Sequence, residues 1–373
     1  MKCIFFTNSV SAHQLPLARE LVKMYGADEF RYVYTTRSSG INQEVLVDES
    51  WVVLYSAGDH DLIESCDVLV VGGLKPIDIL EKRARRNLKT FYMSERWFKP
   101  PLGMLRLLNP RYLSDAYRLV RLLKRAENFI YLPIGVHAAS DMARLCGAFA
   151  GDVRCLFRSP KLDFIKTPGG EVRLMDDGDG KVYGLNKMRM WGYFVEDAKN
   201  KGRTFGFSES QTLKVLWVGR MLDWKCVDTI IKAVVKCSKL GHGITLDVYG
   251  TGPEEKHLKK MIARYNNIIS LHSSVPISEV RGLMREHGVY VLSSNGYEGW
   301  GAVVGEALAE GMYVLGTYEA GASATLLPDE NLFHCGDVGM LAKKLLAIGR
   351  SSSMIALNSF TPRIAAEVLE KGC

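Results

Sequence analysis

The sequence predicts an α/β protein with two doubly wound, Rossmann-like domains. Short apolar segments alternate with segments whose apolar residues recur at helical spacing, which is typical of parallel sheets covered by helices. The chain of 373 residues is too long for one domain of ordinary size. A region with Pro and Gly residues at 156–187 separates two halves that show the same alternation. We therefore expect two parallel sheets, with a site in the cleft between the domains at the carboxyl ends of the strands.

The apolar segments predict the order of the elements. In the first half the predicted strands are 2–6, 30–35, 51–55, 68–71, 90–93 and 129–132, and helices are expected near 15–24, 77–86 and 138–146. In the second half the predicted strands are 213–218, 245–249, 268–271, 289–292 and 313–315, with helices between them. A hairpin or flap is expected in 156–187, where Asp177-Gly178-Asp179 is interpreted as a turn. We place the domains at 1–195 and 196–355, with a linker near 196–210 and a C-terminal helix within 356–373.

The composition is that of a soluble globular protein. Charged residues make up 24% and hydrophobic residues 47% of the chain, and no apolar segment approaches the roughly 20 residues of a transmembrane helix. The N-terminal MKCIFF has too few consecutive apolar residues for a signal peptide and is expected to form the first core strand. We therefore expect a cytoplasmic location.

The eight cysteines and eight histidines do not follow the spacings of metal sites. The cysteines are scattered without a C-x2-C pair, and many lie in predicted strands or helices. The histidines show no H-E-x-x-H spacing. We expect buried, reduced thiols and no metal ion.

Much of the net charge of +7 lies in one segment. Between Arg96 and Arg125 there are eight basic residues and one acidic residue, interleaved with Leu, Met, Trp, Phe and Tyr. Part of this segment has helical periodicity, which favours a surface helix that meets anionic lipid headgroups through Arg118, Arg121 and Arg125. The alternative is a basic helix packed on its own domain with its arginines in water. Because the segment has no nucleic-acid binding motif, a nucleic-acid partner is not expected.

Two carboxylates, Glu298 and Glu306, flank a glycine-rich segment between a predicted strand and a predicted helix. The strand at 289–292 ends shortly before Glu298, and Glu306 lies in the first turns of the helix, so both are expected at the ligand-binding edge of the sheet. Gly299 and Gly301 let backbone N–H groups approach an anion closely, and a helix N-terminus favours a phosphate. This pattern is typical of a sugar-nucleotide site. Glu310, one helical turn beyond Glu306, is expected to be a surface residue.

A second motif makes this pattern specific. Arg220 and Lys225 follow the predicted strand 213–218 in VLWVGRMLDWK, and E-G-W-G-x4-E follows later in the chain. Together the two motifs resemble the G-R-x4-K and E-x7-E signatures of retaining glycosyltransferases of family 4, which have the GT-B fold. The resemblance is strongest from about 210 to 335 and looser before it. Cys226 stands where the family commonly has Gly, and Trp300 replaces the commoner Phe.

The resemblance implies roles for these residues. Arg220 and Lys225 would neutralise the two phosphates of the donor, Glu306 would hold the ribose hydroxyls, and Glu298 would contact the donor sugar. A fixed guanidinium and ammonium stabilise the charge that grows on a departing nucleoside diphosphate without a metal. The second domain would bind the nucleotide sugar, the first the acceptor, and the C-terminal helix would cross back to the first. Further donor-side candidates are Gly219, Gly250, Val275, Gly299, Trp300 and Gly301.

The first half holds the remaining candidates. Its segment FFTNSVSAHQLPLAREL resembles the opening of bacterial polysaccharide glycosyltransferases, and His13 in this segment is the candidate contact to a donor phosphate or an acceptor hydroxyl. A packing role for His13 at the start of a helix is the alternative. His137 and Asp141 at the start of a helix, and Glu95 after a strand end, are candidates on the acceptor side.

The resemblance implies a metal-independent, retaining glycosyltransferase without a cofactor. It would move a sugar from a nucleoside diphosphate, with UDP favoured, to a hydroxyl of a glycan or lipid-linked acceptor in cell-surface polysaccharide or lipopolysaccharide synthesis. Two other classes stay open. A sugar-nucleotide epimerase or hydrolase on the same fold would need its own acid and base. A catalytically silent partner in a glycan-assembly complex would have no need to keep all four charged residues.

Overall fold

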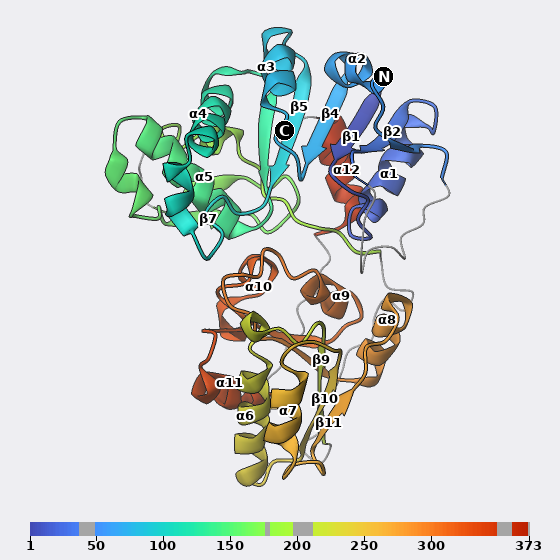
Figure 1. Ribbon diagram of the computed structural model, residues 1–373, viewed down its shortest axis with the longest axis vertical. Helices are drawn as coiled ribbons and strands as arrows, with labels where there is room; N and C mark the ends of the chain where they lie inside the picture. The colour runs from blue at the N-terminus through green and yellow to red at the C-terminus, as the bar shows by residue number, and fades with distance from the viewer. Residues whose placement is uncertain (37–48, 176–179, 197–211, 349–359, 372–373) are drawn as a thin grey trace. The chain divides into compact units, whose positions relative to one another are not determined.

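The computed structural model describes residues 1–36, 49–175, 180–196, 212–348 and 360–371. The chain divides into two compact units, each described by itself below. The N-terminal unit comprises Met1–Val195 with Ser359–Cys373, and the C-terminal unit comprises Glu196–Asn358. Each unit contains one six-stranded parallel sheet with helices against it (Figure 1). The expected α/β fold with two parallel sheets is confirmed, whereas the turn at 177–179 and most of the linker near 196–210 lie outside the described residues.

The sheet of the N-terminal unit has the strand order β3-β2-β1-β4-β5-β6, which is that of a doubly wound fold. Every residue of β1 and β4 is buried, because strands at the centre of such a sheet are covered on both faces. All five pairings are parallel. The strands are β1 (Cys3–Thr7), β2 (Phe30–Tyr34), β3 (Val52–Leu54), β4 (Val68–Gly72), β5 (Lys89–Ser94) and β6 (Phe129–Pro133).

Helices and a hairpin complete the N-terminal unit. The α-helices are α1 (Leu15–Tyr25), α2 (Asp59–Ser65), α3 (Ile77–Arg85), α4 (Pro110–Arg125), α5 (Val136–Phe149) and α12 (Pro362–Lys371). Short 3-10 helices are η2 (Gly103–Leu108), η3 (Val153–Leu156) and η4 (Leu185–Lys187). The antiparallel strands β7 (Leu162–Phe164) and β8 (Val172–Leu174) form the hairpin expected in 156–187.

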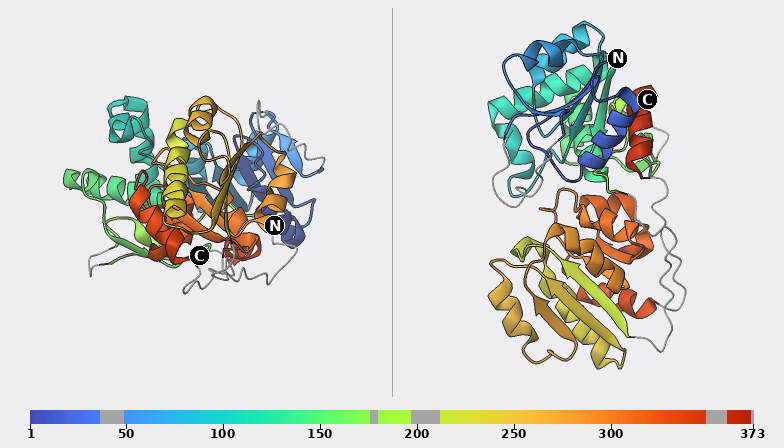
Figure 2. Two further views of the ribbon diagram at one scale, coloured as in Figure 1. Left: turned by 90° about the horizontal axis from the view of Figure 1, so that it is seen from below. Right: turned by 90° about the vertical axis from the view of Figure 1, so that its right-hand side faces the viewer.

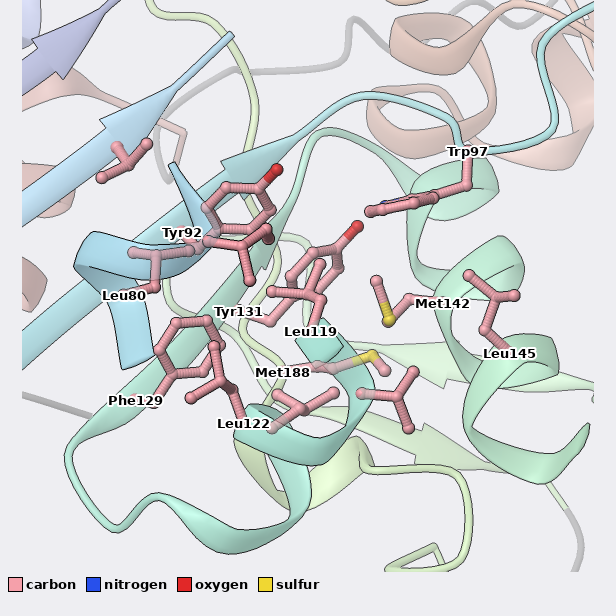
Figure 3. Packing of buried hydrophobic residues seen from close by; sticks show 14 of the residues in the cluster. Leu80, Tyr92, Trp97, Leu119, Leu122, Phe129, Tyr131, Met142, Leu145 and Met188 are labelled. Carbon is pink, nitrogen blue, oxygen red and sulfur yellow. The ribbon is translucent and has the colours of Figure 1, made fainter. Parts of the chain in front are cut away.

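The core beneath α4 and α5 ends in a group of aromatic rings. Tyr92, Tyr131 and Trp97 gather at one end of the cluster, while Leu122 and Phe129 lie at the other (Figure 3). The hydroxyl of Tyr92 donates to the carbonyl of Leu74 at 3.1 Å. The aromatic end of this core therefore lies beside the loop that follows β4.

Helix α4 begins where the sequence supplies both a cap and a proline. The side chain of Asn109 accepts hydrogen bonds from the backbone N–H groups of Arg111 and Tyr112, at 3.0 and 3.3 Å, and Pro110 occupies the first helical position. This start fixes Tyr112 at the end of α4 that adjoins η2. The predicted basic helix in 96–125 is thereby located at Pro110–Arg125.

The C-terminal unit repeats the topology. Its strand order is β11-β10-β9-β12-β13-β14, again wholly parallel. The strands are β9 (Leu213–Val218), β10 (Ile244–Tyr249), β11 (Ile269–His272), β12 (Val289–Leu292), β13 (Tyr313–Thr317) and β14 (Leu332–Phe333). The helices are η5 (Asp223–Lys225), α6 (Val227–Lys239), α7 (Glu255–Ile262), α8 (Ile277–Glu286), α9 (Val303–Ala309), α10 (Gly321–Leu326), η6 (Asp329–Asn331) and α11 (Val338–Ala347).

Helix α12 packs in the N-terminal unit although it is last in the chain. It lies beside α1, and the right-hand view of Figure 2 shows the two together as the red and dark blue helices. The carbonyl of Glu370 accepts a hydrogen bond from Lys89 Nζ at 2.7 Å, and Phe360 stacks on Phe194 with ring centres 5.5 Å apart. These contacts join the end of the chain to β5 and to the segment before residue 196.

Helix α5 starts at Val136, two residues before the predicted start, because Gly135 with φ of 84° makes the turn between β6 and the helix. Within the described residues, no helix is both long enough and apolar enough to cross a bilayer.

Candidate functional site

The carboxyl ends of neighbouring strands bring the predicted donor-side residues to one edge of the C-terminal sheet. Strand β9 is hydrogen-bonded to β12 and ends directly before Gly219 and Arg220. The loop after β12 contains Glu298, and the next helix, α9, contains Glu306 in its first turn. Because all strands of this sheet are parallel, the loops that follow them lie along the same edge.

Lys225 and Glu298 form an ion pair at this edge. The ammonium of Lys225 donates to Glu298 Oε2, and the hydroxyl of Ser294 donates to the same oxygen at 2.9 Å. The side chains of Lys225 and Glu298 are only 17% and 11% exposed. The ammonium also lies 4.5 Å from the ring centre of Trp224. Since the pair is largely removed from water, its charges are held in place and weakly screened.

Hydrogen bonds to backbone carbonyls join the two loops that supply this pair. The hydroxyl of Ser293 donates to the carbonyl of Lys225 at 2.7 Å, and the N–H of Asn295 donates to the carbonyl of Trp224 at 2.9 Å. The carbonyl of Ser294 accepts from the hydroxyl of Thr317 at 2.5 Å. The position of Lys225 relative to Glu298 is therefore set by the backbone of three neighbouring strand ends.

Glu298 and Glu306 both act electrostatically on the buried phenol of Tyr290. Burial raises the pKa of Tyr290 well above its ordinary value, and the carboxylates of Glu298 and Glu306 raise it further. The phenol donates to the carbonyl of Val218, the last residue of β9, at 3.4 Å. Both predicted carboxylates thus act on the Tyr290 hydroxyl, which contacts the last residue of β9. This strand leads into Arg220.

Two glycines allow close backbone approach around the site. A Cβ atom on Gly250, the residue after β10, would lie 1.8 Å from the carbonyl oxygen of Gly219. A Cβ atom on Gly321 would lie 2.3 Å from the carbonyl oxygen of Gly299, beside a hydrogen bond of 2.7 Å from the N–H of Ala322 to the carbonyl of Trp300. Side chains at these positions would separate the loops that hold the site.

The remaining donor-side candidates also lie on loops at this edge. Val275 is partly buried in the loop between β11 and α8, and Gly301 precedes α9 with φ of 88°. Trp300 is 3% exposed, so its indole is a buried part of the loop. Arg220 is exposed beyond the end of β9.

Cys226 adopts a conformation that suits the glycine it replaces. Its φ of 49° lies in the left-handed region. Its Sγ atom lies 3.1 Å from Sγ of Cys335, and this hydrogen bond lowers the pKa of Cys226. These two thiols are partly exposed, unlike the other described cysteines, which are buried as predicted.

The acceptor-side candidates and His13 belong to the N-terminal unit. Glu95 accepts a hydrogen bond of 2.8 Å from the hydroxyl of Tyr193 and pairs with Lys99. The carbonyl of His13 accepts from the N–H of Phe194 at 3.1 Å, and the His13 and Tyr193 ring centres are 6.4 Å apart. His13 and Glu95 therefore both lie beside Tyr193.

Asp141 and His137 are on α5, beside this group. Asp141 is 2% exposed and accepts from the N–H of Phe98 at 3.0 Å, with Arg96 Nε 3.6 Å away. Burial raises the pKa of Asp141, although Arg96 acts in the opposite direction. Asp141 thus supports the loop at 96–98, while His137 occupies the first turn of the same helix.

The structure shows a pocket that the sequence did not reveal. A cavity of about 450 Å³ in the N-terminal unit is lined by Glu95 and Tyr193, and also by Lys75, Arg106 and Trp97. Lys75 follows Gly72-Gly73-Leu74 at the end of β4, and a basic residue after glycines at a strand end is a signal that sequence reasoning can use. In the C-terminal unit, Ser293 and Ser294 directly after β12 were missed in the same way.

One expectation was wrong, and one basic residue is paired in a way that the sequence did not indicate. Glu310 is buried rather than on the surface, and it accepts from Arg281 Nε at 2.5 Å and from Arg285 at 3.2 Å. Arg118 pairs with Asp78 at 2.5 Å and with Glu81 at 2.7 Å and its side chain is 31% exposed, so its contact with lipid stays a prediction. In both cases a neighbouring helix supplies charges that are far away in the sequence.

Comparison with known proteins gives the fold and the class of the second half. Residues 200–354 match the family model of glycosyl transferases group 1. This match spans the whole candidate site at the ends of β9 and β12. A UDP-N-acetylglucosamine–peptide N-acetylglucosaminyltransferase GtfA subunit of Streptococcus agalactiae is 27% identical over 173 residues, which is 43% of this chain and 33% of that protein. An uncharacterized glycosyltransferase of Methanocaldococcus jannaschii is 30% identical over 121 residues, 32% of this chain and 31% of that protein.

Solved structures match the group 1 region together with the first half. HepE of Anabaena, solved in complex with UDP, aligns with a TM-score of 0.59 at 14% identity and covers 100% of this chain and 95% of its own. The lipopolysaccharide outer core galactosyltransferase WaaB, in its apo form, aligns with a TM-score of 0.61 at 10% identity. The alignment covers 100% of this chain and 95% of the WaaB chain. The chain therefore has the predicted GT-B fold. It matches only about a third of the length of the curated relatives named above.

Proposed function

We propose that this protein is a retaining, metal-independent glycosyltransferase that uses a nucleoside diphosphate sugar, with UDP as the favoured nucleotide. Its acceptor would be a glycan or lipid-linked hydroxyl in cell-surface polysaccharide or lipopolysaccharide synthesis. The observation on which the proposal rests is the Lys225–Glu298 pair, held at the ends of β9 and β12 in a region that matches glycosyl transferases group 1. The GtfA relative uses a UDP sugar by its name, and HepE was solved with UDP, which supports the choice of nucleotide.

The proposed reaction assigns a task to each charged residue. The bond between the anomeric carbon and the diphosphate oxygen breaks, and its electron pair stays on the nucleoside diphosphate. Arg220 and Lys225 stabilise the charge that develops there. The acceptor oxygen bonds to the same face of the anomeric carbon, and its proton passes to the departing phosphate. No residue is assigned as a covalent nucleophile.

The carboxylates position the donor in this scheme. Glu306 would accept hydrogen bonds from the ribose hydroxyls, and Glu298 would contact the donor sugar. Because Glu298 also accepts from Lys225 and Ser294, it holds the ammonium where a phosphate would meet it. His13 is proposed to contact a donor phosphate or an acceptor hydroxyl. The two cations supply positive charge of the kind that a metal ion would otherwise provide.

Nucleotide binding tests the proposal. Calorimetric titration with UDP and GDP, each with and without a chelator, should show UDP binding that the chelator does not change. Glu306→Gln should weaken UDP binding by about tenfold or more, because hydrogen bonds to a charged group contribute about 1.5–3 kcal/mol. The matched control is Glu279→Gln, an exposed residue on α8 that carries the same charge and should have no effect.

Three results would contradict the proposal. Binding lost in the presence of a chelator would remove the metal-independent mechanism. Failure of both nucleotides to bind would favour a catalytically silent partner. Release or conversion of the sugar from a UDP sugar without any acceptor would favour a hydrolase or an epimerase.

We also propose that the N-terminal unit meets an anionic membrane surface. The support is a row of leucines, Leu102, Leu105 and Leu108, which are more than half exposed along η2. Leu113 and Tyr117 on α4, and Val153 and Phe157 at η3, are also exposed. Arg111 on α4 and Arg158, shortly after η3, are exposed as well. Exposed apolar side chains among basic residues are typical of surfaces that bind anionic lipid.

Vesicle binding tests this surface. The double variant Leu105→Glu, Leu108→Glu should bind phosphatidylglycerol vesicles at least about tenfold more weakly in a flotation assay, because it loses apolar area and gains negative charge. Leu240→Glu is the matched control, since Leu240 at the end of α6 is 61% exposed and Leu105 is 62% exposed. Equal binding by all three proteins would contradict the proposal.

A further inference from the structure

We infer that the 450 Å³ pocket of the N-terminal unit binds a phosphate group of the acceptor. The inference rests on the proposed function, because it concerns the second substrate of the same enzyme. The pocket lies entirely within the N-terminal unit, at the carboxyl ends of β1, β4 and β5. Ligands bind at this edge in open α/β sheets.

The charges that line the pocket do not balance. Four cations contribute to its wall and one carboxylate opposes them: Lys75, Arg96, Lys99 and Arg106, with Glu95. Two of the cations are already matched, because Lys99 pairs with Glu95 and Arg96 faces the buried Asp141 at 3.6 Å. The wall therefore retains the charge of two cations, Lys75 and Arg106.

Aromatic rings hold the ammonium of Lys75. Its nitrogen lies 4.2 Å from the ring centre of Trp97 and 4.1 Å from that of Tyr112. Among the described residues, none of the ion pairs within 4 Å involves Lys75, and Asp115 acts on it only at longer range. Lys75 as a residue is exposed, and desolvation of its ammonium beside the rings lowers its pKa. An anion in the pocket would restore a favourable environment for this charge.

Arg106 has hydrogen-bonding capacity that the described protein does not use. Its Nε is buried and has no acceptor among the described residues. Its guanidinium lies 6.0 Å from the ring centre of Tyr112, and the hydroxyl of Tyr112 donates to the carbonyl of Trp97 at 2.5 Å. Trp97 and Tyr112 thus place both cations against one aromatic wall. A guanidinium presents several N–H donors in one plane, which suits the oxygens of a phosphate.

The wall of the pocket also contains neutral donors. Asn8, Ser9 and Ser11, from the loop after β1, line the same pocket. Hydroxyl and amide groups donate to phosphate oxygens without adding charge. Two cations match the charge of a phosphate monoester at neutral pH, which is about −1.5 to −2, whereas a carboxylate carries one negative charge. The pocket therefore favours a phosphate over a carboxylate.

The phosphate can belong to a sugar or to a lipid headgroup. Arg106 lies in η2 between the exposed Leu105 and Leu108, so an acyl or isoprenyl chain attached to the phosphate would meet apolar side chains next to the pocket. A sugar phosphate would use the polar wall alone. The same two cations serve both, and the probes below distinguish them.

Calorimetry of the full chain, first saturated with UDP, tests the inference. UDP occupies the proposed diphosphate site, so a second phosphate ligand reports on the N-terminal pocket. The probes are glucose 6-phosphate and geranyl phosphate, with glucose and geraniol as their neutral partners. Lys75→Gln and Arg106→Gln should each weaken binding of the phosphates by about tenfold. Arg85→Gln removes the same charge from an exposed site on α3 outside the pocket and should bind as the parent does.

The outcomes separate this inference from the proposed function. Phosphate binding by the parent that is weaker in both pocket variants would support the inference. Equal affinities of the parent for glucose 6-phosphate and geranyl phosphate would indicate a sugar phosphate. Tighter binding of geranyl phosphate would indicate a lipid phosphate. Absence of phosphate binding, or equal binding by parent and both variants, would overturn it while UDP binding stands. Loss of UDP binding with phosphate binding retained would overturn the proposed function alone. A urea unfolding midpoint equal to that of the parent shows that a variant folds. If Lys75→Gln does not fold, the phosphate affinity of Arg106→Gln tests the inference.

Discussion

Replacing Lys225 by methionine is expected to lower kcat/KM of the folded protein by about two to three orders of magnitude, and also to lower the free energy of unfolding, because Glu298 loses the partner of its buried charge. The ammonium is held by Glu298 and by the ring of Trp224 in a largely buried position, so no other side chain takes its place. Removing one fixed donor that stabilises developing negative charge typically costs a factor of about 10² to 10³. Steady-state kinetics with a UDP sugar measures the effect.

The matched control for this prediction is Lys232→Met. Lys232 on α6 pairs with Asp228 at 2.7 Å on the surface of the same unit, so the control removes the same charge from an ordinary helix pair. Its kcat/KM should equal that of the parent. Equal activity of Lys225→Met and Lys232→Met would remove Lys225 from the mechanism. Glu298→Gln should also lower kcat/KM, and the double variant should lose less than the sum of the two single effects, because the residues act as one pair.

Arg83→Met is expected to have the largest effect on stability, lowering the free energy of unfolding of the N-terminal unit by about 3–5 kcal/mol. Arg83 on α3 is fully buried. Its guanidinium donates to the carbonyls of Ile63, Cys66 and Lys89 at 3.1, 2.9 and 2.8 Å. Burial lowers the pKa of Arg83. Methionine would fill part of the volume but leave these buried carbonyls without donors.

Urea unfolding measures this effect, with Arg85→Met as the control. Arg85 is exposed two residues further along α3, so its replacement should change the unfolding free energy by less than about 0.5 kcal/mol. Arg83 lies near the amino ends of β4 and β5, opposite the edge that holds the pocket, so UDP and phosphate affinities should persist in the folded fraction. An unfolding midpoint equal to that of the control would show that the carbonyls find other donors.

The regular elements of the fold could be predicted because their signal is local. Continuous apolar segments correspond to strands that are buried on both faces, such as β1 and β4. Helix boundaries were less certain, and α5 begins two residues early because of the turn at Gly135. The candidate site was predictable where a loop directly follows a strand, as with Arg220 after β9 and Glu298 after β12.

Contacts between distant segments could not be predicted in this way. Nothing near Glu310 in the sequence indicates Arg281 and Arg285 on α8, which make it a buried, paired residue. Arg118 likewise meets Asp78 and Glu81 from another helix. Long-range ion pairs depend on which helices pack against each other, and the sequence pattern of a single helix does not indicate its neighbour.

The sequence alone determined the α/β class, the two parallel sheets and the edge of the second sheet where Arg220, Lys225, Glu298 and Glu306 gather, because strand periodicity and strand-end loops are local properties. Only the tertiary structure decided how these groups meet. The hydroxyl of Ser294 and the ring of Trp224 orient the Lys225–Glu298 pair. The pocket with Lys75 and Arg106 exists because β4 and η2, separated in the chain, place two cations against the same aromatic rings. Such a site depends on distances in space, which residue order does not contain.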